Sequence, residues 1–146
     1  MSIKLAMVMS EFNQAITERL LKGALTRLEH YKLPANQIPI LRVPGAIEIP
    51  YAAQQLLERQ NYDAIIALGA VIRGETSHYD SVCQQVSYGC QRLILDYKTP
   101  VIFGVLTTEN GEQAYARSGG NHSDKGAEAV DAAMAMINMK QRLESV

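Results

Sequence analysis

The sequence predicts an α/β domain of three layers, an α/β/α sandwich in which helices cover both faces of a four-stranded parallel sheet. Short runs of β-branched and aliphatic residues alternate with stretches whose apolar residues recur at helical spacing, as in βαβ units. The run Ala64–Ile72 is apolar throughout, which is typical of a strand buried on both faces of a parallel sheet. The 146 residues form one domain, because no repeat or linker divides them.

Local signals set the order and the approximate bounds of the elements. Pro44-Gly45 closes the second strand, and Pro50 restricts its own position to the first turn of the second helix. Ser77 and Asp80 have the spacing of a capping box that begins the third helix, and Gly119-Gly120 ends the fourth. The predicted strands are residues 3–9, 38–43, 64–72 and 100–106. The predicted helices are residues 16–28, 47–59, 77–97, 109–117 and 124–142.

The composition excludes several classes of partner. Fourteen basic and fifteen acidic residues leave a net charge of −1, which favours neither nucleic acid nor a membrane surface. The longest apolar run is too short to span a membrane, and we expect no targeting peptide. Cys83 and Cys90 form no disulfide framework or metal motif, so we expect buried, reduced thiols and a cytoplasmic protein.

Four loops should meet at one edge of the sheet, where ligands bind in parallel α/β folds. They are residues 10–13, 44–48, 73–78 and 107–110. The third loop follows Gly69 with P-loop-like spacing, but Glu75 stands where a P-loop has lysine, so we exclude an NTPase. The start of the next helix can still hold phosphate through free backbone N–H groups, although a plain strand-to-helix turn fits the same residues.

Three side chains on these loops are candidates for chemistry. His78 lies in a first helical turn, where the helix dipole favours a neutral ring suited to acid/base work; a packing role fits equally well. Phe12 lies in a polar turn with no obvious core to enter and can stack on a planar ligand. Glu48 can accept hydrogen bonds from ligand hydroxyls, or it can simply favour the start of a helix.

Three further residues are weaker evidence for a functional site when each is considered alone. Arg117 and Lys125 flank a glycine-bearing loop; such cations are usually solvated, but they can also bind phosphate. Phe103 lies in the fourth predicted strand and, on its own, fits the core better than a site.

Five ordered blocks nevertheless carry a resemblance to a known family, and it extends over essentially the whole chain. They are Phe12-Asn13 with Ile16, residues 43–50, residues 69–80, residues 100–109, and Arg117 with Lys125-Gly126. In this order they resemble 6,7-dimethyl-8-ribityllumazine synthases. The resemblance implies a flavodoxin-like fold and a transferase that condenses 5-amino-6-(D-ribitylamino)uracil with 3,4-dihydroxy-2-butanone 4-phosphate. Phosphate and water leave in this penultimate step of riboflavin biosynthesis, with neither metal nor cofactor.

The resemblance also implies a role for each site residue. His78 is the expected proton-transfer residue, Phe12 the ring that stacks on the uracil, and Phe103 an aromatic lid from a neighbouring subunit. The contacts of the ribityl chain are Ala46, Ile47 and Glu48. The backbone partners of the pyrimidine edge are Ala70, Val71 and Ile72. The phosphate contacts are Glu75, Thr76, Arg117 and Lys125.

The expected partners follow from the same resemblance. They are the two small-molecule substrates, further copies of the chain in homopentamers, and riboflavin synthase. Pentamer, pair of pentamers and closed cage all stay open at this point. A non-catalytic flavodoxin-like module that binds a flavin or phosphate is the main alternative, and a structural shell protein is another.

Overall fold

The computed structural model describes residues 2–146 and confirms the predicted three-layer sandwich. Its sheet is parallel throughout and has the strand order β2-β1-β3-β4. The strands are β1 (Leu5–Ser10), β2 (Ile40–Val43), β3 (Ala64–Ile72) and β4 (Val101–Thr108). The helices are α1 (Gln14–His30), α2 (Ile49–Arg59), α3 (His78–Tyr97), α4 (Gly111–Ala116) and α5 (Lys125–Glu144). Two 3₁₀ turns, Ala35–Gln37 and Ala46–Glu48, precede β2 and α2.

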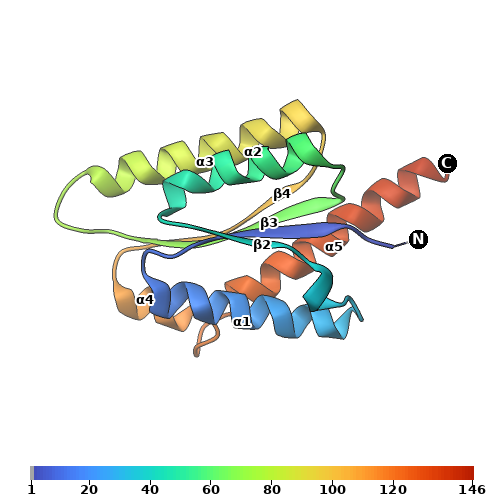
Figure 1. The fold of residues 1–146 in the computed structure, drawn as a ribbon. Coiled ribbons are helices and arrows are strands. Elements are labelled where there is room, and N and C mark those ends of the chain that lie inside the picture. The colour runs from blue at the N-terminus through green and yellow to red at the C-terminus, as the bar shows by residue number, and fades with distance from the viewer. Residues whose placement is uncertain (1) are drawn as a thin grey trace.

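The core consists of two apolar layers, one on each face of the sheet. Alternate residues of a strand point to opposite faces, so Met7 and Met9 pack against α1 and α5, while Ala6 and Val8 pack against α2 and α3. Figure 1 shows the same division, with α2 and α3 above the sheet and α1, α4 and α5 below it. Residues 64–71 of β3 are all buried, as expected for a central parallel strand. No helix within residues 2–146 has the combination of length and apolar character that crossing a membrane requires.

The second and third helices begin differently in detail from the sequence prediction. The second helix begins with a 3₁₀ turn, and the α-helical part starts at Ile49, which leaves Pro50 in the first turn as predicted. The third helix begins at His78 with Ser77 at the N-cap, as predicted, but the Ser77 side chain forms no capping hydrogen bond, so the capping box itself does not form. Its expected partner Asp80 instead forms an ion pair with Arg73, with 3.3 Å between Oδ1 and Nη2.

The two cysteines are free thiols on α3. Cys90 is buried, as predicted, and burial raises its pKa to about 11. Cys83 is only partly buried, so the prediction holds for it in part. Burial also raises the pKa of Cys83, and therefore neither thiol is activated as a nucleophile.

Candidate active site

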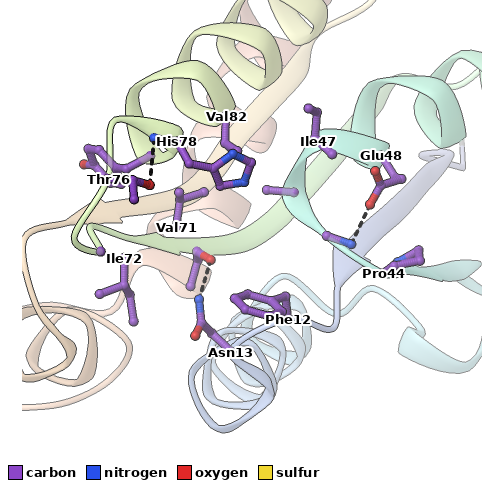
Figure 2. A pocket seen from close by; sticks show the side chains of 15 residues that line it. Phe12, Asn13, Pro44, Ile47, Glu48, Val71, Ile72, Thr76, His78 and Val82 are labelled. Carbon is purple, nitrogen blue, oxygen red and sulfur yellow. Dashed lines mark hydrogen bonds between the residues drawn. The ribbon is translucent and has the colours of Figure 1, made fainter.

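A cavity of about 430 Å³ opens at the carboxyl edge of the sheet, between β1, β3 and the start of α3. The chain turns from β1 towards β2 on one side and from β3 towards β4 on the other, so this is the point where the strand order reverses. Ligands bind at such reversal points because the flanking loops diverge there. The lining residues are Phe12, Asn13, Pro44, Gly45, Ala46, Ile47, Glu48, Ala70, Val71, Ile72, Gly74, Thr76, His78, Tyr79 and Val82 (Figure 2).

The turn after β1 holds an aromatic ring at the mouth of the cavity. The backbone N–H of Phe12 donates to the Pro44 carbonyl at 2.9 Å, which ties the turn to the end of β2. Asn13 takes the left-handed conformation (φ 65°), which asparagine tolerates better than most residues. Its amide donates to the Ala70 carbonyl at 2.9 Å and so joins the turn to β3. The Phe12 ring stays 72% exposed, so it can stack on a planar ligand.

The 3₁₀ turn Ala46–Glu48 forms the adjoining wall. The carboxylate of Glu48 accepts the backbone N–H of Gly45 at 2.8 Å through Oε1, so it helps to shape the turn that carries it (Figure 2). A carboxylate has several further lone pairs, and a ligand hydroxyl can use those that this bond leaves. The structure therefore shows Glu48 in a role at the helix start, and its role as an acceptor for a ligand stays a prediction.

The end of β3 supplies the floor. Pairing between β1 and β3 stops at Met9 and Leu68, whereas β3 continues to Ile72. The edge of residues 69–72 that faces β1 therefore lies beyond the β1 ladder, and its backbone groups can pair with the edge of a flat heterocycle. Gly69 allows the close approach at this point, because a Cβ there would lie 2.7 Å from the Ser10 hydroxyl.

His78 is the first residue of α3 and its side chain lies in the cavity (Figure 2). Its backbone N–H donates to the Thr76 hydroxyl at 3.3 Å, which connects the loop to the first helical turn. The amino end of a helix offers free N–H groups and the positive end of the dipole, so an anion can bind beside this ring. Glu75 belongs to the same loop but is exposed and does not line the cavity.

The structure brings most of the sequence-predicted site residues together. Those that line the cavity are Phe12, Ala46, Ile47, Glu48, Ala70, Val71, Ile72, Thr76 and His78. The fourth loop, residues 107–110, was expected at the same rim but does not line the cavity; its Glu109 bonds Arg73 instead.

Phe103, Arg117 and Lys125 lie elsewhere in the described chain, residues 2–146. Phe103 pairs with Ala67 in the middle of the edge strand β4 and is partly buried against the apolar layer on the α2 and α3 side of the sheet. Arg117 ends α4, and its carbonyl accepts the backbone N–H of Lys125 at 2.9 Å. These two cations are neighbours of each other rather than of the cavity.

Sequence reasoning gave no role to several lining residues. Asn13 carried a signal, because it stands in a polar turn after a strand and its side chain can bond backbone groups. Tyr79 and Val82 could have been found from helical spacing, since Val82 lies one turn after His78 on the same face. Within residues 2–146, no three histidine, cysteine, aspartate or glutamate side chains are grouped as metal ligands would be.

Comparison with known proteins identifies relatives over nearly the full length. A family model described as 6,7-dimethyl-8-ribityllumazine synthase matches residues 2–141. A protein of that name from Coxiella burnetii (strain Dugway 5J108-111) is 55% identical over 143 residues, which cover 98% of this chain and 95% of the relative. Proteins of the same name from Bdellovibrio bacteriovorus and Pediococcus pentosaceus are 51% and 46% identical. Both alignments cover 97% of this chain, with 77% and 91% of the respective relatives.

Proposed function

The chain belongs to the 6,7-dimethyl-8-ribityllumazine synthase family and is an enzyme of riboflavin biosynthesis, and we propose that the cavity beside His78 is where its two substrates are joined. The substrates are 5-amino-6-(D-ribitylamino)uracil and 3,4-dihydroxy-2-butanone 4-phosphate. The non-catalytic alternative is not favoured, because relatives that match almost the whole chain carry the name of the enzyme.

One observation carries the proposal. Three loops that are distant in sequence place a stacking ring, an acceptor carboxylate and a histidine around one cavity. The uracil ring stacks on Phe12 and pairs with backbone groups of β3 beyond its ladder with β1, where the Ala70 carbonyl also accepts the Asn13 amide. The ribityl chain lies along residues 46–48, where Glu48 accepts from its hydroxyls. The phosphate lies at the amino end of α3, beside Thr76 and Glu75, where the backbone N–H groups rather than the Glu75 carboxylate bind it.

His78 then serves the proton transfers of the reaction. The ring amine attacks the ketone, and water leaves as the imine forms. Loss of phosphate and closure of the second ring with loss of water complete the lumazine. Each of these steps moves a proton to or from a reacting group, and the imidazole of His78 can accept and return it. Much of the remaining rate comes from holding two substrates in register in one cavity.

The remaining site residues come from a neighbouring subunit in this proposal. Phe103, Arg117 and Lys125 do not line the cavity of their own chain, so a second copy supplies the aromatic lid and the cations that neutralise phosphate. A ring of identical contacts closes at a fixed number of copies, and the family resemblance gives five. Light scattering should then find a species of about 80 kDa or a multiple of it, given a chain mass of 16.1 kDa.

A direct assay tests the activity. The purified protein is mixed with both substrates, and the absorbance of the lumazine and the release of phosphate are followed together. Equal amounts of the two products are expected, and neither should form when one substrate is left out. Substrate binding without turnover would contradict the assignment and would favour the alternative function, a non-catalytic binding module.

The proposal also covers the cellular compartment of the enzyme and one protein partner. We place it in the cytoplasm, in agreement with its two free thiols. We also expect association with riboflavin synthase, which uses the lumazine product. Cosedimentation of the two purified proteins tests the association, and separate sedimentation at equimolar micromolar concentrations would exclude it.

A further inference from the structure

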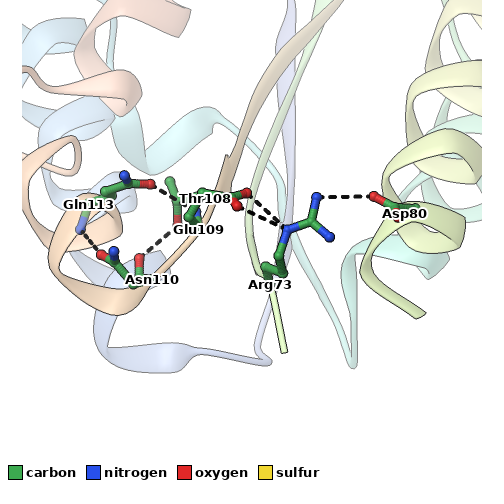
Figure 3. Close-up of polar contacts among 6 residues, drawn as sticks. All are labelled: Arg73, Asp80, Thr108, Glu109, Asn110 and Gln113. Atoms are coloured by element: carbon green, nitrogen blue, oxygen red, sulfur yellow. Dashed lines mark hydrogen bonds and ion pairs between the residues drawn. The ribbon is translucent and has the colours of Figure 1, made fainter. Parts of the chain in front are cut away.

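Arg73 is fixed at several points at the junction between β3 and the start of α3. Its backbone N–H donates to the Thr108 carbonyl at 2.8 Å. Its Nε lies 3.1 and 3.0 Å from the two carboxylate oxygens of Glu109, and its Nη2 lies 3.3 Å from Oδ1 of Asp80 (Figure 3). The guanidinium also lies 4.5 Å from the centroid of the Tyr79 ring. We call the three charged side chains the Glu109–Arg73–Asp80 bridge.

The bridge holds a segment that has few other anchors. Residues 74–77 are exposed, and nothing lies within 4 Å of the position that a Cβ on Gly74 would take. The Ser77 side chain makes no capping hydrogen bond. Arg73 contacts the first turn of α3 directly after His78, through the Tyr79 ring and the Asp80 carboxylate. It therefore connects this turn of α3 with the end of β4.

Arg73 is poorly placed to bind the substrate phosphate itself. It does not line the cavity, and its guanidinium already faces two carboxylates. The hydrogen bond to Glu109 raises the pKa of Arg73, and the nearby negative charges act in the same direction. A phosphate would have to compete with two carboxylates that the chain itself supplies.

We propose that Arg73 is a positioning residue, which fixes the first turn of α3 through Asp80 and Tyr79 and thereby holds the His78 ring in the cavity. This inference rests on the proposed function. Exposed ion pairs contribute little to global stability. A displacement of about 1 Å at a reacting group can lower the rate by about 100-fold. The bridge should therefore affect catalysis far more than folding.

Arg73→Ala is the first test. We expect kcat to fall by about 10- to 100-fold, with KM for both substrates within about twofold of the wild type. Arg73→Lys keeps the charge but loses the forked donor geometry, so its kcat should lie between the two. An unchanged kcat would overturn the proposal. A rise in KM that accounts for the whole loss of kcat/KM would overturn it too.

Two companion variants separate positioning from a general surface effect. Asp80→Asn should lower kcat in the same way, and the double variant with Arg73→Ala should lose no more than Arg73→Ala alone, because both changes open the same bridge. If the two substitutions lowered kcat independently of each other, Arg73 would not act through Asp80.

Arg92→Ala is the matched control, because Arg92 pairs with Asp96 at 3.2 Å on the same helix, remote from His78 in sequence. It should keep wild-type kcat.

A spectroscopic readout makes the inference independent of turnover. Fluorine spectra of protein labelled with 2-fluorohistidine can be assigned to His78 by its loss in His78→Ala. Arg73→Ala should shift or broaden the His78 signal and leave those of His30 and His122 unchanged. An unchanged His78 signal would overturn the positioning role even if the assay of the wild type failed. Absence of lumazine from the wild type, in turn, would count against the proposed function alone.

Discussion

The carboxyl edge of the sheet and the turn between α4 and α5 both carry residues that the family resemblance selects, but one chain assembles only the first of them into a cavity. At the edge, loops from β1, β2 and β3 converge on His78 and Phe12. At the turn, the backbones of Arg117 and Lys125 are hydrogen-bonded to each other, and neither residue lines the cavity. In the proposed function, the turn therefore completes the cavity of another copy of the chain.

The topology explains why the two regions differ. The carboxyl ends of parallel strands meet at one edge, so residues at strand ends become neighbours within the same chain. Phe103 stands in the middle of an edge strand, and Arg117 ends a short helix. At these positions neither Phe103 nor Arg117 lines the cavity of its own chain. Residues at such peripheral places can complete a site only when a second copy packs against it.

The largest effect is expected from a change inside the cavity. His78→Ala should slow lumazine formation by about 100- to 10,000-fold, the usual contribution of one general acid or base. The fold should persist, because the residue begins a helix and is exposed rather than part of the core. Stopped-flow absorbance across pH 6 to 8 measures the loss. Wild-type turnover over that range would exclude the proton-transfer role.

A change at the turn should have the next largest effect. Arg117→Ala should raise KM for the butanone phosphate by about 10- to 100-fold, because charge-assisted hydrogen bonds to phosphate are lost. KM for the uracil substrate, which carries no phosphate, should change little. Equal losses for both substrates would indicate a damaged subunit contact instead.

Mixed oligomers sharpen the comparison between the two regions. When the His78→Ala and Arg117→Ala chains are coexpressed in equal amounts, random assembly leaves both residues intact at about a quarter of the boundaries. The mixture should therefore regain about a quarter of wild-type activity, although either variant alone is nearly inactive at subsaturating butanone phosphate. If each site lay within one chain, activity would stay at the mean of the two variants.

A smaller effect is expected for the stacking ring. Phe12→Ala should raise KM for the uracil substrate by about 2- to 10-fold, because an aromatic stack contributes about 0.5–1.5 kcal/mol. Stability should hardly change, since the ring is 72% exposed. Phe12→Tyr keeps the stacking face and should keep KM. If KM rose only for the butanone phosphate, the stacking assignment would be wrong.

The sequence was sufficient for the fold and for most members of the cavity, for a physical reason. Continuous apolarity from Ala64 onward marked the central strand, and loops at strand ends converge in any parallel sheet. The sequence did not reveal the partner of Asp80, because an ion pair with Arg73 and a capping bond with Ser77 are equally compatible with the spacing. It also could not assign Phe103 to a core or a site from this chain alone, since the proposed site for this ring lies on another copy.

The smallest effect should come from a cluster of three side chains that connects α1 to α5, outside the cavity. Arg27 and Tyr31 of α1 both bond the carboxylate of Asp131 on α5, the tyrosine hydroxyl at 2.8 Å. Partial burial of Asp131 opposes its charge, but the hydrogen bonds from Arg27 and Tyr31 outweigh it and lower its pKa below 3.8. Because the pKa of Asp131 is lower in the folded than in the unfolded protein, its ionised form stabilises the fold at pH values above the unfolded-state pKa. This stabilisation is lost as the pH falls through the folded-state pKa.

Asp131→Asn should therefore lower Tm at pH 7 by no more than about 3 °C, because Arg27 and Asp131 are only partly buried. The difference from the wild type should shrink as the pH falls below the ordinary aspartate pKa of 3.8, where the wild-type carboxyl also becomes neutral. Calorimetry between pH 3 and 7 measures both quantities. Since Asp131 does not line the cavity, kcat should not change. A lower kcat would mean that the α1–α5 contact supports the site, and the separation between the two regions would then fail.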